Sequence, residues 1–388
     1  MILSKFLSAC TSLPGRTAPP DNYQVDVISH GTGPLWVVAG PGSGKTDSMA
    51  LRCLKLMIVD KVPPRAIVVT TFTEKAARNL EERIALYMQY FSTKFSELQG
   101  IDYSRLRVGT LHAICNDVMQ EFRFIGYQNY RLLTDMEQRL FIMEHSSFAG
   151  MGPPPAQSQV WDSLPYLATG YDPVGGGQWR PGSGHLPNRW VRARATQTLF
   201  NRIVEDHVDT TKMRAAGGHW ASIADAYDEY SQKLFGYHRC DFAHLQTKFL
   251  EFLGTHQSKL FMIGDGTDQF PGIRHVLVDE YQDTNPIQEK IYLKLAEPSP
   301  HNLCVVGDDD QALYRFRGGT VECMVNLPAA LKREGLNVGA LKPSPLPVNY
   351  RSHDSIVKFC DEFMGSFAVM SQTGARARES SPYRPGPG

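Results

Sequence analysis

The sequence predicts an α/β protein in which a parallel sheet is interrupted by a mostly helical insertion. Four stretches are continuously apolar rather than alternating, as expected of strands that helices cover on both faces. These stretches are residues 34–40, 66–73, 275–280 and 303–309. Helical patterns lie between them, and strands that alternate with helices favour a doubly wound sheet.

Charge and cysteine usage narrow the functional class. The 388-residue chain is long enough for two domains and has a formal net charge of zero, so binding to nucleic acid would require a local basic groove. Its seven cysteines form no CxxC pair, which argues against a zinc or iron–sulfur site and is typical of a reducing compartment. No apolar run is long enough to cross a membrane.

Residues 1–20 precede the first predicted strand and contain Lys5 and Arg16 but no acid. We expect a disordered leader here, with a weak organelle-targeting signal as the alternative.

The first apolar stretch ends in a glycine-rich loop that opens a helix. Glycines let the loop curl with its N–H groups pointing inward, and a helix N-terminus attracts anions. The lysine of such a loop can reach the β- and γ-phosphates of a nucleotide, and the next hydroxyl can bind magnesium. The candidate phosphate-binding residues are Ala39, Gly40, Pro41, Gly42, Ser43, Gly44, Lys45 and Thr46.

Three helices follow from periodicity and capping signals. One begins after Thr46 with a single apolar face, and one lies within residues 73–88, where apolar residues recur every four positions. The third has Asn285 as its N-cap, Pro286 at its first position and Gln288 completing a capping box.

The third apolar stretch ends in two adjacent carboxylates, Asp279 and Glu280. A buried strand that ends in two acids requires a positive partner. We expect Asp279 and Thr46 to hold the magnesium of a bound nucleotide, with Lys45 nearby. Glu280 would then orient and deprotonate the attacking water, because phosphoryl transfer needs mainly positioning and charge neutralisation.

The middle of the chain, residues 116–239, has mostly helical patterns. It includes two Pro/Gly-rich stretches, residues 150–159 and 171–190, which we expect to be loops. The α/β pattern then resumes. The predicted core therefore comprises residues 21–115 and 240–345.

Several segments, in this order after the phosphate loop, resemble superfamily 1 DNA helicases of the UvrD/Rep/PcrA type. They are "TTFTEKAARNLEERI" (70–84), "VGTLHAIC" (108–115), "CDFAHL" (240–245), "DEYQD" (279–283), "VGDDDQALYRFRGG" (306–319) and "NYRS" (349–352). The resemblance implies a RecA-like P-loop NTPase core that uses ATP and Mg²⁺. It also implies ATP hydrolysis coupled to movement along single-stranded DNA and to strand separation.

The resemblance also implies roles at the nucleotide. Gln24 would hydrogen-bond the edge of adenine, and Tyr350 would stack on its face. Gln311 would contact the γ-phosphate and report its presence to the DNA site. Arg351 would reach the same phosphate as an arginine finger. These roles suit an amide, a flat ring and a guanidinium.

For single-stranded DNA the resemblance points to aromatic rings that stack bases and to polar groups that hold phosphates. The residues are Phe72, Thr73, His112, Tyr314, Phe316 and Arg317. Phe316 stands where relatives commonly carry Trp, so we expect weaker stacking there.

The sequence departs from the family pattern in two ways. Asp47 stands where relatives carry an Arg that stacks on the base, so base affinity and selectivity are in question. In addition, residues 346–370 would only begin a second motor domain, and residues 371–388 would form a disordered tail. The rest of that domain would come from a further part of the protein or from a partner chain.

These observations favour the ATP-binding part of a UvrD-like DNA helicase, inactive as a helicase in this form. It would act in the cytoplasm at the nucleoid, or in the nucleus of a eukaryote. The alternatives are a catalytically dead nucleotide- or DNA-binding module and an unrelated P-loop NTPase. DNA-stimulated ATP turnover separates the helicase from the dead module, and single-strand binding that ignores ATP would favour the unrelated NTPase.

Overall fold

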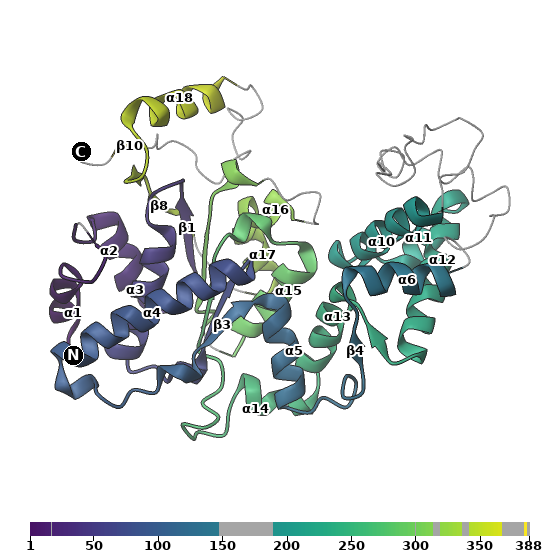
Figure 1. The fold of residues 1–388 in the computed structure, drawn as a ribbon, viewed down its shortest axis with the longest axis horizontal. Coiled ribbons are helices and arrows are strands. Elements are labelled where there is room, and N and C mark those ends of the chain that lie inside the picture. Colours follow the sequence, from purple (N-terminus) through teal and green to yellow (C-terminus); the bar gives the residue numbers. More distant parts are fainter. Residues whose placement is uncertain are drawn as a thin grey trace. The chain divides into compact units, whose positions relative to one another are not determined.

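The computed structural model describes residues 1–16, 18–146, 189–298, 300–312, 319–335, 341–366 and 384–385. The chain divides into two compact units (Figure 1). The first combines Met1–Phe122 with Glu251–Gly388, and the second is Arg123–Leu250.

A six-stranded sheet with the order β3-β2-β6-β7-β1-β8 forms the centre of the first unit, and every neighbouring pair is parallel. Its strands are β1 (Leu35–Ala39), β2 (Ile67–Thr71), β3 (Arg107–Thr110), β6 (His275–Val278), β7 (Leu303–Gly307) and β8 (Ser344–Leu346). The α/β class and the four apolar strands are therefore confirmed.

The two edge strands, β3 and β8, were not among the strands predicted from the sequence. An edge strand is covered less completely than a central one, so its sequence need not be a continuous apolar run. β3 contains Arg107, and β8 contains Pro345, a residue that sheets accept mainly at their edges.

The predicted helices cover this sheet. α3 (Lys45–Ile58) and α4 (Glu74–Lys94) pack against each other, and Leu54 and Leu80 lie in one core with Val37 of β1. α15 (Pro286–Ala296) begins with the expected capping box between Asn285 and Gln288.

The expectation of a disordered leader is wrong for residues 1–16. Residues Leu3–Cys10 form helix α1, which buries Phe6, Ala9 and Cys10. The ring of Phe6 stacks on Phe91 of α4 with centroids 5.0 Å apart. The apolar residues of this segment therefore form a face that packs against α4. The absence of acids, on which the expectation of a leader was based, does not show this packing.

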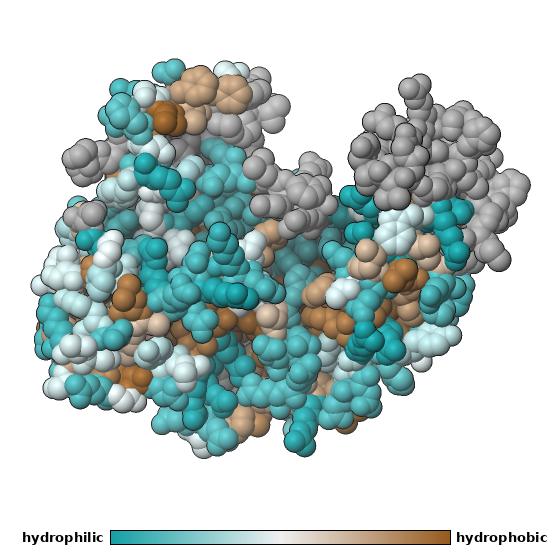
Figure 2. All heavy atoms as spheres, in the orientation of Figure 1, coloured by the Kyte–Doolittle hydropathy of each residue, from teal (hydrophilic) through white to brown (hydrophobic). Residues whose placement is uncertain are grey.

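The other elements of this unit are short or lie beside the sheet. They are α2 (Asn22–Ser29), α5 (Leu111–Glu121), α14 (Lys259–Met262), α16 (Val321–Val325), α17 (Leu327–Arg333), α18 (Asp354–Gly365), β9 (Val348–Asn349) and β10 (Arg384–Pro385). On α18, Ile356, Phe359 and Phe363 are exposed, and Figure 2 shows apolar side chains gathered on this helix.

The second unit is mostly helical, as expected of the insertion. It contains β4 (Arg131–Leu132), α6 (Asp135–His145), α10 (Arg189–Glu205), α11 (Thr210–Ala215), α12 (Gly218–Gly236), β5 (Arg239–Cys240) and most of α13 (Phe242–Leu253). Buried Asp241 accepts hydrogen bonds from the Tyr230 hydroxyl (2.7 Å) and from Nε2 of Gln138 (3.0 Å).

Its boundaries differ from the expected residues 116 and 239. α5 packs on β3 and so belongs with the sheet, which moves the first boundary to Arg123. β5 pairs with β4 inside the second unit, which moves the other boundary to Leu250. Residue 346 is no boundary either, because Leu346 belongs to β8 and the residues that follow stay with the first unit.

Some expectations lie outside the described residues. These are the expected loop 150–159, most of the expected loop 171–190, and most of the expected tail 371–388. Where these segments are described, the expectations are wrong, because Arg189 and Trp190 begin α10 and Arg384–Pro385 pairs with β9 as β10. Within the described ranges, no helix has both the length and the apolar character needed to cross a membrane.

Candidate nucleotide site at the carboxyl edge of the sheet

The parallel sheet brings together the loops that follow β1, β6 and β7. β7 lies between β6 and β1, so the glycine-rich loop, the acids after β6 and residues 308–311 meet at one edge. Ligands of open α/β sheets bind outside the carboxyl ends of the strands. The site is therefore built from segments that are far apart in sequence.

A side chain would be strained at two positions of the glycine-rich loop. Gly42 (φ 70°) and Gly44 (φ 81°) are left-handed, a conformation that glycine adopts without strain. A Cβ atom at Gly44 would lie 2.7 Å from Nε2 of Gln24, and one at Gly42 would lie 2.7 Å from Oδ1 of Asn349. The loop leads directly into the N-terminus of α3 at Lys45, so its backbone suits a phosphate group.

Lys45 and the two acids converge, as expected. The Nζ atom of Lys45 lies 3.3 Å from Oε2 of Glu280, and the Thr46 side chain interacts with the Asp279 carboxyl. Burial, and then the neighbouring Glu280, raise the pKa of Asp279 above its usual value, while Lys45 opposes the shift. A hydroxyl beside a buried carboxylate is an oxygen donor set that suits Mg²⁺.

The backbone at Glu280 explains how both acids reach this side. Side chains alternate along a strand, so two consecutive acids would ordinarily point apart. Glu280 has a φ of 53°, in the left-handed region, and its N–H donates to Oδ1 of Asp279 at 3.0 Å. Such strain in a non-glycine residue clusters at functional sites, and here it breaks the alternation directly after β6.

Gln282 is a site residue that the sequence analysis missed. Its Nε2 donates to Oε2 of Glu280 at 2.7 Å, and its Oε1 accepts from the backbone N–H of Asp308 at 3.0 Å. Nε2 of Gln311 in turn donates to the Asp308 carboxylate. The sequence contains only a weak signal for this role, because the burial of the amide and its contact with Asp308 appear only in the folded chain.

The "NYRS" segment packs on the glycine-rich loop. The Tyr350 N–H donates to the Gly42 carbonyl at 2.9 Å, and Oδ1 of Asn349 accepts from the N–H groups of Arg351 and Ser352. Asn349, also missed in the sequence, thus shapes this turn. The Arg351 side chain is exposed.

A cavity of about 220 Å³ lies beside this turn. It is lined by Pro41, Asp308, Asp310, Gln311, Asn349, Ser352, Ile356, Val357, Cys360 and Asp361. The structure thus gathers Gln311 and the glycine-rich loop around one space. Arg351 is not among the lining residues.

The two candidate adenine-binding residues meet at the start of α2. Asp21 is the N-cap of this helix, and Gln24 forms the capping box with it. The Tyr350 hydroxyl donates to the Asp21 carboxylate. Nε2 of Gln24 also donates to the carbonyl of Ser43 in the glycine-rich loop at 3.1 Å, so this cluster adjoins the phosphate loop.

The candidate DNA residues within the described chain follow the other strands at the same edge. Phe72 and Thr73 follow β2, and His112 is the second residue of α5 after β3. Thr73 caps α4 by accepting from the Ala76 N–H at 3.2 Å. Burial lowers the pKa of His112 to about 4, so at neutral pH its ring is uncharged. Tyr314, Phe316 and Arg317 lie outside the described residues.

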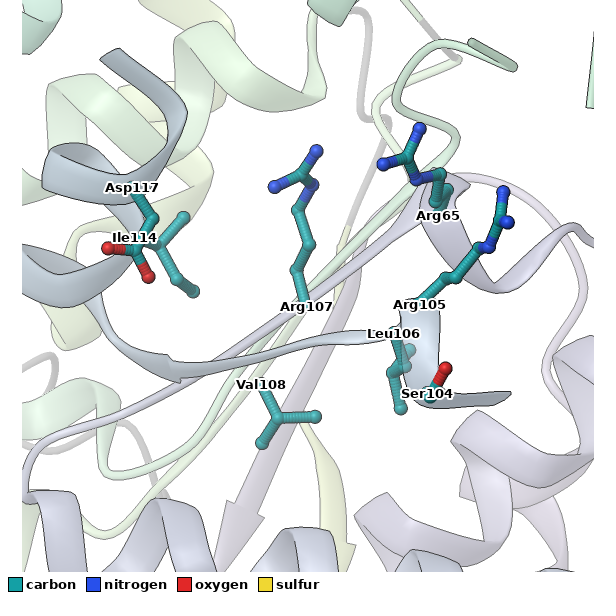
Figure 3. Close-up of a pocket in the computed structure, with 8 residues that line it drawn as sticks. All are labelled: Arg65, Ser104, Arg105, Leu106, Arg107, Val108, Ile114 and Asp117. Carbon is teal, nitrogen blue, oxygen red and sulfur yellow. The ribbon is translucent and has the colours of Figure 1, made fainter. Parts of the chain in front are cut away.

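Another hollow, of about 330 Å³, lies near the amino end of β3 and so away from the nucleotide edge (Figure 3). Arg65, Arg105 and Arg107 are the basic residues among those that line it. Glu121 pairs with Arg65 (3.3 Å) and Arg107 (2.8 Å), and Asp102 pairs with Arg105 (2.9 Å). Asp117 also lines the hollow, so three carboxylates balance the three guanidinium charges and the hollow has no excess charge to attract an anion.

Comparison with known proteins identifies the family of this chain. The family model described as "UvrD/REP helicase N-terminal domain" matches residues 21–332. The chain belongs to this family. The match confirms the resemblance found in the sequence and agrees with the RecA-like α/β core of parallel strands.

Relatives of this UvrD/REP chain include three named ATP-dependent DNA helicases. PcrA of Bacillus subtilis is 26% identical over 350 residues, which cover 87% of this chain and 38% of the relative. SRS2 of Saccharomyces cerevisiae is 26% identical over 338 residues (83% and 25%), and UvrD1 of Mycobacterium tuberculosis is 27% identical over 315 residues (77% and 34%). The chain thus spans between 25% and 38% of the length of these relatives.

Proposed function

We propose that this chain is the ATP-binding and ATP-hydrolysing part of a UvrD-like helicase that moves along single-stranded DNA and separates duplexes. The observation that carries the proposal is the approach of the Lys45 amine to Oε2 of Glu280, 3.3 Å apart, beside a glycine-rich loop. The helicase names of the relatives support the choice of substrate.

Nucleotide binding would use the groups already gathered at the sheet edge. The N–H groups of the loop and of the α3 N-terminus, with Lys45, would hold the β- and γ-phosphates. Gln24 and Tyr350 would contact adenine. Thr46 and Asp279 would hold Mg²⁺, which when bound neutralises charge that develops on the phosphates.

Hydrolysis would begin with an exchange of partners at Lys45. When the triphosphate enters, the Lys45 amine leaves Glu280 for a phosphate oxygen. The Glu280 carboxylate is then free to accept a proton from the attacking water. Gln282 keeps this carboxylate oriented, because its amide bonds both Oε2 of Glu280 and the backbone of Asp308.

The amide of Gln282 would also connect the γ-phosphate to the catalytic base, Glu280. Gln311 would contact the γ-phosphate, and it is held by Asp308, whose N–H binds Gln282. Arg351, which is exposed, would have to turn inward to stabilise charge in the transition state as an arginine finger.

Single-stranded DNA would cross the loops after β2 and β3. The aromatic residues Phe72, Tyr314 and Phe316 would stack on bases. The polar residues Thr73 and Arg317 would hold phosphates. Because the His112 ring is uncharged at neutral pH, it would bind a phosphate as a hydrogen-bond donor rather than as a cation. Such contacts do not depend on the base sequence. A protein that binds DNA in this way would work at the nucleoid or in the nucleus.

The partner of α18 would be a second RecA-like motor domain, in the same protein or in another chain. Ile356, Phe359 and Phe363 are more than half exposed on this helix (54%, 66% and 54%), and Figure 2 shows this apolar surface. Translocation requires a cleft between two domains that opens and closes, and such a domain would cover these side chains.

ATP turnover of the chain, with and without single-stranded DNA, tests the proposal. We expect MgATP binding and phosphate release that the DNA accelerates. Binding without any turnover would instead indicate a nucleotide-binding module, and DNA binding that ignores ATP would indicate an unrelated P-loop NTPase.

A further inference from the structure

Asp47, the third residue of α3, lies in a dense polar cluster beside the phosphate loop. Its carboxylate accepts from the Tyr87 hydroxyl at 2.6 Å and pairs with Arg83 at 3.2 Å. It also pairs with Nη1 of Arg16, a residue of the N-terminal segment that forms α1 and the turn after it. The Arg16 and Asp47 side chains are only 9% and 12% exposed.

The remaining contacts of Arg16 point toward the candidate adenine-binding residues. Its Nε donates to the Ala18 carbonyl at 3.2 Å, and Nη2 approaches Oε1 of Gln24 at 3.5 Å. It also interacts electrostatically with Tyr350. One guanidinium thus contacts the amide of Gln24 and lies within electrostatic range of Tyr350, the two residues that a nucleobase could engage.

The packing of the N-terminal segment keeps this guanidinium in place. Phe6 and Cys10 are fully buried, and Leu13 is 3% exposed. Burying an arginine away from water is costly unless a partner compensates its charge, and Asp47 is that partner. A flat guanidinium that is fixed in this way can stack on a base or bond to its edge with little loss of entropy.

We propose that Arg16 is the nucleobase-binding cation of this chain and that Asp47 is its positioning residue. The helix that follows the phosphate loop contributes the acid, and the N-terminal segment contributes the arginine. The inference rests on the proposed function, because it assumes that a nucleoside triphosphate occupies the loop. With Arg16 in this role, the N-terminal segment is part of the nucleotide site.

Calorimetric titration of the full chain with MgATP and with magnesium tripolyphosphate tests the inference. Both ligands present phosphates to Lys45, but only ATP has a base. We expect Arg16→Ala to weaken MgATP binding about tenfold and to change tripolyphosphate binding less than about twofold. Arg16→Lys keeps the ion pair with Asp47 but lacks the flat guanidinium, so it too should weaken MgATP binding more than tripolyphosphate binding. Because it keeps the ion pair, it should fold even if the alanine variant does not.

Arg83→Ala is the matched control, because Arg83 also pairs with Asp47 but is 44% exposed. It should leave the MgATP affinity within about twofold of the wild type. The exchange variant, Arg16→Asp with Asp47→Arg, should recover most of the MgATP affinity that Arg16→Asp alone loses.

The outcomes distinguish a failure of the proposed function from a failure of the role assigned to Arg16. If the wild type binds neither ligand, the proposed function fails. If it binds both, and a folded Arg16 variant alters both affinities equally or alters neither, Arg16 has only a structural role and the inference is overturned. A folded exchange variant that recovers nothing overturns it as well.

Discussion

The amine of Lys45 and Oε2 of Glu280 lie 3.3 Å apart, although 235 positions separate the two residues in the chain. The amine occupies the position from which it can reach a phosphate in the loop. Each residue therefore neutralises the other, and in the proposed function a triphosphate would take the place of the carboxylate at Lys45. Four predictions follow from this geometry and from the elements that support it.

Replacing Lys45 should greatly weaken nucleotide binding. We expect Lys45→Ala to weaken the binding of a fluorescent ATP analogue by about a hundredfold, because a charge-assisted contact is lost and Glu280 loses its counter-charge. Lys94→Ala, at an exposed residue at the end of α4, serves as the control and should bind normally. Unchanged affinity in the Lys45 variant would refute the site.

Glu280→Gln should retain nucleotide binding and lose hydrolysis. The amide keeps the shape of the side chain but cannot accept the proton of water, and a general base contributes about 10²- to 10⁴-fold. Phosphate release, measured at saturating MgATP with single-stranded DNA, should fall by at least about a hundredfold. If turnover survives, another group is the base.

Gln282→Ala should slow turnover more than it weakens binding. The change removes both bonds of the amide, so the Glu280 carboxylate loses its orientation and the Asp308 N–H loses its acceptor. We expect kcat to fall at least about tenfold and the free energy of unfolding to fall by about 1–3 kcal/mol.

The control for this variant is Gln288→Ala. Gln288 is another buried glutamine, but it caps α15 and does not contact Glu280. It should lower stability by about 1 kcal/mol and leave kcat unchanged. Equal losses of kcat in the two variants would show that Gln282 acts only through stability.

Acid should destabilise the sheet through His275. Burial, and then the charge of Arg52, lower the pKa of His275 from its usual 6.5 to about 4. Between these values the unfolded chain binds a proton that the folded chain does not, so stability is complete above pH 6.5 and falls as the pH drops toward 4. The loss amounts to at most about 3 kcal/mol.

Urea unfolding at pH 7.5, 5.5 and 4.5 measures this effect. His275→Asn should reduce the dependence on pH, whereas His238→Asn, at an exposed residue, should not. A pH dependence that is the same in the wild type and the His275 variant would contradict the prediction.

Local patterns account for what could be predicted. β1, β2, β6 and β7 were predicted because buried parallel strands are continuously apolar, and the loop at residues 39–46 because a tight phosphate turn needs glycine. The start of α15 was predicted because its capping residues lie within one turn of each other.

What was missed depends on contacts between distant segments. Gln282 has a clear role only once β6 and β7 are neighbours, and β8 becomes a strand only because β1 offers it an edge. The packed N-terminal helix was missed because Phe6 finds its partner, Phe91, on another helix.

By itself, the sequence determined the four apolar strands of the sheet, the glycine-rich loop and the presence of two acids, since these depend on the residues next to each other in the chain. Only the tertiary structure decided that Glu280 turns left-handed toward Lys45, that Gln282 connects it to Asp308, and that Arg16 pairs with Asp47. The physical reason is that a buried polar group must find its partner in space, and no local pattern of residues specifies which distant group that is.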